Sequence, residues 1–374
     1  MRICISRTER NAYSETFIRD QIAEFSKLVT VYTVHGGRFP ERQENNQLLH
    51  SKIFWFLHKM IKGIVGRNNF FSNYSMKKYL KGNSIDVVLA NYGSSASHFV
   101  PVCKSLQIPL LPIFHGHDAT NKKYLTKYKD KYQKLFDYAS FIIVVSEEMK
   151  RGLVKNGAPE NKIKVIPCGV NISKFKPKNQ MVKEPRFLAV GRFTNKKGPL
   201  YTLRAFYRVL QQHPTATLTM VGKKEGVLYD ECEKLVKELR MDKAVIFTGI
   251  LNQDQIADLM QQSLAFVQHS ITASNGDMEG TPVSILEAAA SALPIISTLH
   301  GGIKEAVIHG KTGFLVEEKD EDAMAKYMIQ LIENPRQAQE LGAQGRAHII
   351  THYQQQDQIA KIYELAQLSI QAKA

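Results

Sequence analysis

The stretch Asp277-Met-Glu-Gly-Thr-Pro-Val-Ser-Ile-Leu-Glu-Ala-Ala-Ala290 joins a polar loop to an apolar helical run. Its Gly280-Thr281-Pro282 segment suits the start of a helix, with Thr281 at the N-cap and Pro282 in the first turn. Amides at the start of a helix attract anions, and Gly280 lets the backbone approach a ligand closely. We therefore expect the amides of 281–284, including that of Val283, to bind a diphosphate.

Two glutamates flank this predicted helix start. Glu279 lies just before the anion site, where its carboxylate would accept hydrogen bonds from sugar hydroxyls. Glu287, five residues into the helix, would bind the vicinal hydroxyls of a ribose, as an acidic residue does in other nucleotide-binding folds. The spacing alone also fits a solvated glutamate followed by a capping turn, so the interpretation depends on the rest of the chain.

Outward from this stretch, apolar runs alternate with helical patterns along the chain. Such runs suit parallel strands covered on both faces, so the pattern predicts an α/β fold. The predicted strands are Arg2–Ile5, Leu28–Thr33, Asp86–Ala90, Leu110–Phe114, Phe141–Val145, 163–166, Arg186–Val190, Thr217–Val221, Val245–Phe247, Ala265–Gln268 and Ile295–Ser297. The predicted helices include 14–27, 199–212, 229–240, 253–262 and 283–291.

The series of strands and helices restarts near residue 185. The preceding stretch, 173–185, is polar, carries two prolines and has no clear period, which predicts an interdomain linker. We therefore expect two Rossmann-like doubly wound domains, 1–175 and 185–352, that face each other across a cleft. Ligands would bind at the carboxyl ends of their strands. Residues 353–374 are expected to form a C-terminal helix.

The loop after strand 186–190 carries two candidate cations. Gly191 allows a tight exit from the strand, and Arg192 and Lys197 would neutralise a leaving diphosphate. Lys196 competes with Lys197 for this role. An ordinary basic loop remains the alternative for this motif taken by itself.

Glycines follow three further predicted strands. Gly222 and Gly249 lie where a nucleobase and phosphates would be enclosed, although ordinary turn glycines would give the same pattern. Gly301-Gly302 and Glu305 follow strand 295–297 and would close the rim of the pocket, unless they form a simple loop.

The polar turn after strand 110–114 contains His115, His117 and Asp118. His115 would project into the cleft and hydrogen-bond a sugar. The spacing of these three side chains could suggest a metal site. No further ligand at helical spacing is evident, so we expect no metal here. A histidine-rich turn with only a structural role is the alternative.

The net charge of +15 lies in the first half of the chain. Residues 1–180 hold 29 Lys and Arg against 13 Asp and Glu, whereas residues 181–374 hold 21 against 22. This asymmetry suggests an anionic lipid, a phosphorylated acceptor or a nucleic acid as partner. Aromatics mixed with cations at 50–81 and 122–136 favour an anionic membrane surface, with solvated amphipathic helices as the alternative.

Several sequence patterns that would indicate secretion, a membrane span or nucleic-acid binding are missing. It shows no signal-peptide pattern, no apolar run of about 18 residues and no cysteine pairs, so we expect a cytoplasmic protein with at most peripheral membrane contact. It also shows no helix-turn-helix, zinc-finger or RNA-binding signature, so no nucleic acid is expected. The four scattered cysteines are Cys4, Cys103, Cys168 and Cys232.

Together these segments resemble glycosyltransferase family 4, a large family of retaining enzymes with the two-domain GT-B fold. The strongest similarity is in DMEGTPVSILEAAASALPIISTLHGGIKEAVIHGKTGFLV (277–316), and VGRFTNKKG (190–198) matches the cationic loop. VIPCGVNISKF (165–175) and FTGILNQDQIADLMQQSLAFVQHS (247–270) match in the same order. Residues 14–22, 115–118 and 275–280 resemble the subgroup that builds bacterial exopolysaccharide or capsule.

The resemblance implies transfer of a hexosyl unit from a UDP- or GDP-sugar to a glycan or polyprenyl-diphosphate-linked acceptor, with retention and without a metal or cofactor. The C-terminal helix would cross back to the N-terminal domain. The implied catalytic residues are Arg192, Lys197, Glu279 and His115. The implied donor-binding residues are Gly191, Gly222, Gly249, Ile250, Leu251, Gly280, Thr281, Pro282, Val283 and Glu287.

One segment departs from the family pattern. Many members carry paired glycines after the first strand, whereas this chain has Ser6-Arg-Thr-Glu-Arg-Asn-Ala-Tyr-Ser14. Phosphate contact there is therefore not expected, and Arg7, Arg10 and Ser14 become candidates for binding the acceptor. The competing interpretations are a basic nucleic-acid- or membrane-binding protein, and another GT-B enzyme such as a phosphorylase or an epimerase.

Overall fold

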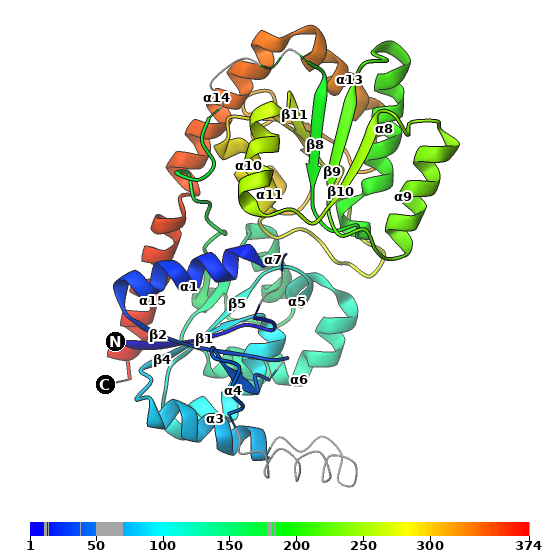
Figure 1. Ribbon diagram of the computed structural model, residues 1–374. Coiled ribbons are helices and arrows are strands. Elements are labelled where there is room, and N and C mark those ends of the chain that lie inside the picture. Colours follow the sequence, from blue (N-terminus) through cyan, green and yellow to red (C-terminus); the bar gives the residue numbers. More distant parts are fainter. Residues whose placement is uncertain are drawn as a thin grey trace. The chain divides into compact units, whose positions relative to one another are not determined.

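The computed structural model describes residues 1–10, 13, 15–37, 39–49, 70–177, 182 and 184–373. The chain forms two compact units (Figure 1). The first comprises Met1–Ile166 and Ile359–Ala374, and the second comprises Pro167–Gln358. Residues 167–175, which we expected in the N-terminal domain, thus belong to the second unit.

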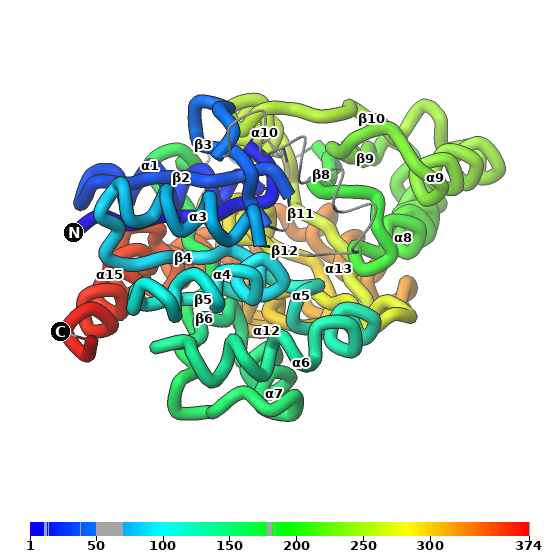
Figure 2. Tube along the Cα trace, turned by 90° about the horizontal axis from the view of Figure 1, so that it is seen from below, coloured from blue at the N-terminus to red at the C-terminus, as the bar shows by residue number. Residues whose placement is uncertain are grey.

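The first unit is built on a seven-stranded sheet of order β3-β2-β1-β4-β5-β6-β7 (Figure 2). Neighbouring strands are parallel, except that β3 runs antiparallel to β2. Every residue of β4 and β5 is buried, because helices cover both faces of a parallel sheet. The strands are β1 (Arg2–Ser6), β2 (Thr30–His35), β3 (Arg42–Gln43), β4 (Val87–Asn91), β5 (Leu110–Phe114), β6 (Ile142–Val144) and β7 (Ile163–Val165).

Helix α6 of the first unit buries one apolar face. In α6, Tyr128, Tyr132, Leu135 and Phe136 are buried, whereas most of the lysines between them are exposed. The helices are α1 (Thr16–Leu28), α3 (Phe70–Gly82), α4 (Gly93–Leu106), α5 (His117–Thr120), α6 (Lys122–Tyr138) and α7 (Glu147–Lys155), with the 3₁₀ turn η1 (Glu160–Lys162) before β7.

The second unit contains a six-stranded sheet of order β10-β9-β8-β11-β12-β13, parallel throughout. Its strands are β8 (Arg186–Val190), β9 (Thr217–Val221), β10 (Val245–Gly249), β11 (Ala265–Val267), β12 (Ile295–Thr298) and β13 (Gly313–Val316). Its helical segments are η2 (Asn195–Lys197), α8 (Pro199–Gln212), α9 (Val227–Glu238), α10 (Gln253–Gln262), α11 (Val283–Ala290), α12 (Ile303–Ala306), α13 (Glu321–Glu333) and α14 (Pro335–His352).

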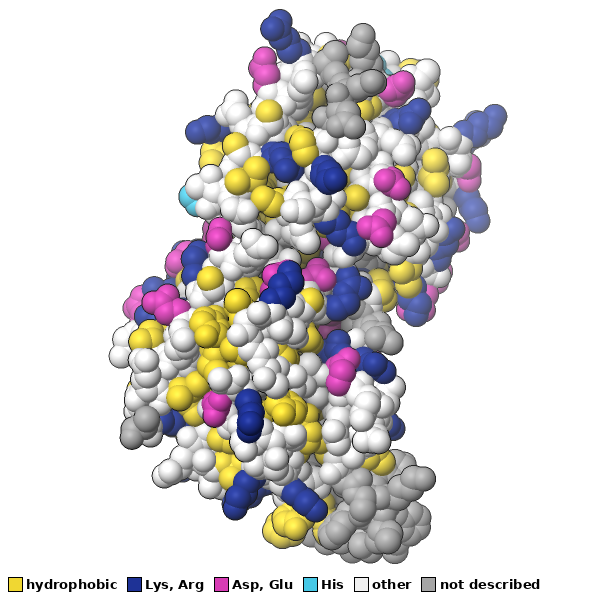
Figure 3. Space-filling model, turned by 60° about the vertical axis from the view of Figure 1, so that its left-hand side comes forward, with side chains coloured by type: hydrophobic (Ala, Val, Ile, Leu, Met, Phe, Trp, Pro, Cys, Tyr) yellow, Lys and Arg dark blue, Asp and Glu magenta, His cyan; other side chains and the backbone are white. Residues whose placement is uncertain are grey.

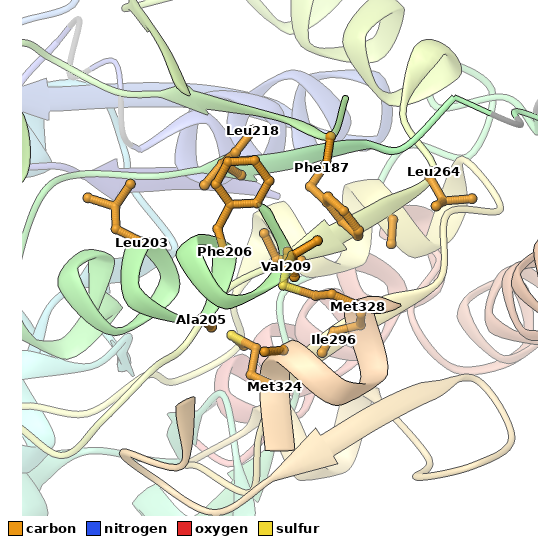
Figure 4. Packing of buried hydrophobic residues seen from close by; sticks show 14 of the residues in the cluster. Phe187, Leu203, Ala205, Phe206, Val209, Leu218, Leu264, Ile296, Met324 and Met328 are labelled. Carbon is orange, nitrogen blue, oxygen red and sulfur yellow. The ribbon is translucent and has the colours of Figure 1, made fainter. Parts of the chain in front are cut away.

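The core of the second unit fixes this sheet between two helical layers. On one face, Phe187 of β8 packs with Phe206 of α8 and with Met324 and Met328 of α13 (Figure 4). On the other face, residues of α10, α11, α12 and α14 form a second cluster. Each fully buried large apolar side chain contributes about 1.5–3 kcal/mol, so the strand ends are held rigidly where the loops emerge.

The last helix, α15 (Gln355–Gln371), begins in the second unit and continues in the first. Gln355 pairs with Val170 near its start, where the Gln355 amide donates to the Val170 carbonyl at 3.1 Å. Near its end, the Lys373 ammonium donates to the Tyr138 hydroxyl at 2.8 Å. Ile359, Ile362 and Ala366 are buried along its length. The chain therefore returns to the first unit at its C-terminus.

Most predicted strands lie within one or two residues of the observed ones, and three errors have local causes. Leu28 ends α1 instead of starting a strand, and its side chain is exposed there. Strand β3 consists of only two residues, both polar. Strand β13 is also short and follows a turn. Neither was predicted, because short strands carry little periodic signal.

Helix α14 offers a matched pair of glycines that tests its packing. A Cβ at Gly342 would lie 2.1 Å from the Ala292 carbonyl oxygen, whereas one at Gly345 would lie 3.4 Å from the Thr312 carbonyl oxygen, an ordinary contact. We expect Gly342→Ala to lower the free energy of unfolding by about 1–3 kcal/mol in urea titrations. Gly345→Ala should leave it unchanged or raise it by up to about 1 kcal/mol. Equal effects of the two changes would contradict the packing.

Candidate functional site

Three strand-end loops of the second unit meet through their glycines. The Gly191 amide donates to the Val221 carbonyl at 2.9 Å, and the Gly222 amide donates to the Gly249 carbonyl at 3.1 Å. A Cβ at Gly222 would lie 2.2 Å from the Gly191 carbonyl oxygen. Only glycine permits this approach, which brings the ends of β8, β9 and β10 together at one edge of the sheet.

The loop after β8 directs its two lysines to different partners. Lys196 is buried, and its ammonium donates to the Asp277 carboxylate and the Met278 carbonyl, both at 3.2 Å. The Lys197 ammonium donates to the Gln268 side chain at 3.2 Å and lies 3.4 Å from the Glu279 carboxylate. Lys196 therefore anchors the acidic loop, whereas Lys197 is the lysine beside Glu279.

Arg192 and Lys197 line the same small cavity, of about 30 Å³, together with Gly191 and Gln268. Arg192 is exposed, so its guanidinium is available to an external anion. Gly198, which follows Lys197, has φ +52°, and a Cβ there would lie 1.9 Å from the His269 carbonyl oxygen. Glycine at 198 thus lets the cationic loop pack against the end of β11.

The carboxylate of Glu279 is buried and ionised. Its side chain is 6% exposed. Burial raises its pKa, but the nearby cations Lys197 and Lys196 outweigh burial and hold the pKa below its ordinary value. For Lys197, burial dominates over the attraction of Glu279 and lowers the pKa of the ammonium. The two groups form a sheltered ion pair at the strand edge.

The backbone of Glu279 is positioned by His300. The Glu279 amide donates to Nε2 of His300 at 3.1 Å, and Nδ1 of His300 lies 2.6 Å from the Glu318 carboxylate. Nε2 accepts a hydrogen bond, so the ring proton is on Nδ1 and is donated to Glu318. Gly301 has φ +47°, and a Cβ there would lie 2.3 Å from the Glu279 carbonyl oxygen. The Gly301-Gly302 turn thus packs against the acidic loop.

Helix α11 begins one residue later than we predicted. Pro282 occupies the N-cap position with extended backbone, φ −76° and ψ 97°, and Val283 is the first helical residue. Thr281 is not the N-cap, because its hydroxyl accepts a hydrogen bond from the Cys168 amide at 3.3 Å. The Val283 and Ser284 amides donate to no atom of the described residues. These two amides, with Gly280 before them, lie at the helix start where the sequence predicted anion binding.

Glu287 connects α11 to the loop after β10. It is buried on α11, and Nε2 of Gln253 donates to its carboxylate at 3.5 Å. Ile250 and Leu251 lie just before Gln253, with Ile250 exposed and Leu251 packed against the second core cluster. Glu287 is thus a neighbour of the loop that carries Ile250 and Leu251, two other residues implied to bind the donor.

His115 lies in the first unit, where β5 ends. Nδ2 of Asn91 donates to the Ser6 carbonyl and to Gln21, so Oδ1 of Asn91 must accept, and it lies 2.8 Å from Nε2 of His115. Nε2 therefore carries the proton, and the buried Nδ1 is an acceptor with no hydrogen-bond partner among the described residues. Burial lowers the pKa of His115 to about 4, so the ring is neutral at pH 7.

Asp118 stabilises the turn that carries His115. Its carboxylate accepts hydrogen bonds from the amides of Gly93, His115 and Gly116 at 2.8–3.1 Å. This arrangement gives Asp118 a structural role. Among the described residues, no group of three or more His, Cys, Asp or Glu side chains gathers in a way that could hold a metal ion.

The three residues predicted to bind an acceptor have different surroundings. Arg7 is buried, and its guanidinium donates to both carboxylate oxygens of Glu44 at 2.8 and 2.6 Å. Arg10 is more exposed and lies 3.4 Å from the same carboxylate. Thr33 also donates to Glu44. Burial raises the pKa of the Glu44 carboxylate, but the contacts with Thr33, Arg7 and Arg10 outweigh burial and hold this pKa below its ordinary value. Ser14 lies outside the described residues.

The packing of α6 buries aromatic side chains that were predicted to form part of a membrane-binding surface. The aromatics of 122–136 were expected to lie beside cations at the surface, but Tyr128, Tyr132 and Phe136 pack into the core. Of the stretch 50–81, residues 50–69 lie outside the described part of the chain. On the face in Figure 3, Lys and Arg side chains are interspersed with Asp and Glu. No helix among the described residues is long and apolar enough to cross a membrane.

Some contributors to the site were missed from the sequence. His300 and Gln268 lie at strand ends, but neither belongs to a pattern with a recognisable spacing. Lys196 was considered only as a rival to Lys197, since a sequence does not indicate which of two adjacent side chains points inward. The available signal for the role of His300 was its place just beyond the carboxyl end of strand β12, two residues after Thr298.

Two family models match consecutive parts of the chain. Residues 14–174 match the model described as Glycosyltransferase Family 4, and residues 171–348 match the model described as Glycosyl transferases group 1. The amylovoran biosynthesis glycosyltransferase AmsK of Erwinia amylovora is 29% identical over 286 residues, which are 75% of this chain and 70% of that protein. WcaL of Escherichia coli, a glycosyltransferase named for colanic acid biosynthesis, is 30% identical over 250 residues, 64% of this chain and 60% of WcaL.

A solved structure gives the same fold. HepE of Anabaena in complex with UDP-glucose matches with a TM-score of 0.77 at 17% identity, covering 97% of this chain and 99% of that one. The two α/β units described above, each built on a mainly parallel sheet, are the elements of the GT-B fold expected from the sequence.

The His300 contacts lead to a stability prediction. Replacement of His300 by Leu removes the acceptor for the Glu279 amide and the donor to Glu318, so we expect the free energy of unfolding to fall by about 1–3 kcal/mol. In His300→Gln the amide oxygen can take the place of Nε2, and part of this loss should be recovered. Urea unfolding of both variants gives the comparison, and a Leu variant as stable as the parent would disprove the positioning role.

Proposed function

Because the chain belongs to the family 4 glycosyltransferases, we propose that it transfers a hexosyl unit from a nucleotide-diphosphate sugar. The acceptor would be a glycan or lipid-linked glycan in bacterial surface polysaccharide synthesis. The similarity to AmsK, named for amylovoran biosynthesis, and to WcaL, named for colanic acid biosynthesis, supports this context. The proposal includes UDP- and GDP-sugars as donors.

The observation that carries the proposal is the convergence at the edge of the second sheet. A cationic pair, Arg192 and Lys197, lies with a buried carboxylate, Glu279, and with the amides that begin α11. Opposite charges at these positions suit a ligand that has both an anionic diphosphate and neutral hydroxyls. A nucleotide sugar has both in one molecule.

Each group has a proposed role. The Val283 and Ser284 amides and the Arg192 guanidinium would bind the diphosphate, because a helix start and a planar cation both favour phosphate oxygens. Lys197 would add positive charge as the bond to the sugar breaks. Glu279, kept ionised by its lysine neighbours, would accept hydrogen bonds from sugar hydroxyls, and Glu287 would bind the ribose.

His115 is proposed to contact the sugar by a specific atom. Its Nε2 proton is already donated to Asn91, so the remaining lone pair on Nδ1 would accept a hydrogen bond from a sugar hydroxyl. The lowered pKa keeps this lone pair available throughout the neutral range. His115 would thus bind substrate without transferring a proton.

We infer a retaining transfer by attack on the front face. The acceptor oxygen would bond to the anomeric carbon on the side from which the diphosphate departs, and the acceptor proton would pass to a diphosphate oxygen. The protein would supply positioning and charge stabilisation. The ion pairing of Glu279 with Lys197 supports a binding role for this carboxylate. NMR coupling constants of the product would show whether the donor configuration is kept.

The cationic residue and the carboxylate should matter for turnover. We expect Arg192→Gln and Glu279→Gln each to lower kcat by about 10²-fold or more, since each removes charge aimed at the reacting groups. Released nucleoside diphosphate, measured with UDP- and GDP-sugars and a lipid-linked acceptor, gives the rates. Arg186→Gln is the matched control, because Arg186 is exposed at the opposite end of the same strand.

Near-normal rates in either variant would refute the role assigned to that residue. The base is identified by a thermal-shift comparison of UDP and GDP, because a ligand that binds only the folded state raises its apparent stability. Glu287→Ala should reduce that shift more than it reduces kcat.

The two cations should also make a divalent metal unnecessary. We expect turnover to be unchanged by excess EDTA, because Arg192 and Lys197 would balance the leaving diphosphate in place of a metal ion. Activity before and after chelation is the measurement. A loss of activity that Mg²⁺ or Mn²⁺ restores would show that the cations are insufficient.

A further inference from the structure

A cavity of about 480 Å³ opens in the first unit at the carboxyl ends of β1 and β2. It is lined by Thr8, Glu9, Arg10, His35, Gly36, Gly37 and Arg42. Its volume falls within the roughly 300–1,000 Å³ of pockets that bind small molecules. None of the roles proposed for the donor uses this cavity.

The shape of the cavity is set by backbone contacts. The amides of Gly36 and Gly37 both donate to the Thr8 carbonyl, at 3.1 and 2.9 Å. These contacts require φ of +102° and +106°, which only glycine adopts without strain. A Cβ at Gly37 would meet nothing within 4 Å, so Gly37 borders open space.

The charged groups around the cavity favour an anion. Arg42 and Arg10 are exposed, and the Arg42 guanidinium uses one nitrogen to donate to the Asn46 carbonyl at 2.8 Å. Glu9 is the carboxylate that lines the cavity. The adjacent Glu44 carboxylate is occupied by Arg7, which donates to both its oxygens, and it lies 3.4 Å from Arg10. Two guanidiniums therefore face the space against one carboxylate.

A histidine supplies the independent sign of a ligand. His35 is only 4% exposed, and its Nε2 has no hydrogen-bond partner among the described residues. Burial lowers its pKa, and a hydrogen bond to the Gln43 carbonyl acts in the opposite direction. With the other ring nitrogen donating to Gln43, Nε2 carries a lone pair. A buried acceptor without a donor is costly, and a ligand hydroxyl would satisfy it.

We propose that this cavity binds an acidic sugar of the acceptor. Arg10 and Arg42 pair with an anionic oxygen group, carboxylate or phosphate, and Nε2 of His35 accepts a hydrogen bond from a hydroxyl on the same sugar. The inference rests on the proposed glycosyl transfer and narrows its acceptor to anionic glycans. A neutral acceptor would offer neither guanidinium an anionic group to pair with.

The test is direct binding to the full chain by saturation-transfer NMR, without donor and without turnover. Glucuronate and glucose 1-phosphate represent the two sources of anionic oxygen, and glucose is the neutral probe. We expect one or both anionic sugars to bind at least about tenfold more tightly than glucose, since charged hydrogen bonds are worth more than neutral ones. All three are measured again in Arg192→Gln, which removes binding at the diphosphate site.

Single substitutions measure how much each side chain of the cavity contributes to binding. Arg42→Gln should weaken the anionic sugars by about tenfold or more, whereas Arg19→Gln removes an equal charge from exposed α1 and should not change binding. His35→Asn keeps a donor for the Gln43 carbonyl and removes Nε2, so it should weaken glucuronate binding without unfolding the chain. Circular dichroism checks the fold of each variant.

Equal binding of glucose and the anionic sugars, or full affinity in Arg42→Gln, would overturn the inference. Absence of anion binding in a chain that still transfers sugar would reject this inference alone. Anion binding in a chain that releases no nucleotide from any donor would reject the proposed function alone.

Discussion

The burial of one negative charge constrains the second unit. An ionised carboxylate removed from water costs several kcal/mol unless cations and hydrogen bonds offset it. Glu279 meets this requirement by ion pairing with Lys197, by the nearby charge of Lys196, and by a backbone fixed on His300. Three strand-end segments of one sheet, after β8, β11 and β12, are needed to assemble these contacts. The order of the parallel strands is what brings them together.

Much of this arrangement follows from the sequence. Strands Leu110–Phe114, Arg186–Val190 and Thr217–Val221 were predicted with the bounds they have in the structure, because each is mostly apolar and is followed by a glycine or a polar residue. Since parallel strands place their loops at one edge, the glycine-marked loops could be assigned to a common site before the structure was known. The grouping of Arg192, Lys197 and Glu279 is of this kind.

Other features depend on packing that no local pattern encodes. The cap of α11 was misassigned because the Thr281 hydroxyl bonds Cys168, which is more than a hundred residues away in the chain. The aromatic face of α6 looked suited to a membrane, but the same periodicity serves equally to fill a core. His35 and Arg42 drew no attention in the sequence. They lie on an edge where a two-residue antiparallel strand, itself too short to predict, brings them together.

The path of α15 has a consequence for how the molecule is synthesised. The second unit is one uninterrupted segment, Pro167–Gln358, whereas the first is completed by Ile359–Ala374. A ribosome therefore delivers the whole second unit before the final helix of the first unit leaves the exit tunnel. The N-terminal sheet must wait, with the surface that covers Ile359, Ile362 and Ala366 still open to solvent, until α15 has been made. In this chain the part made first is the part finished last.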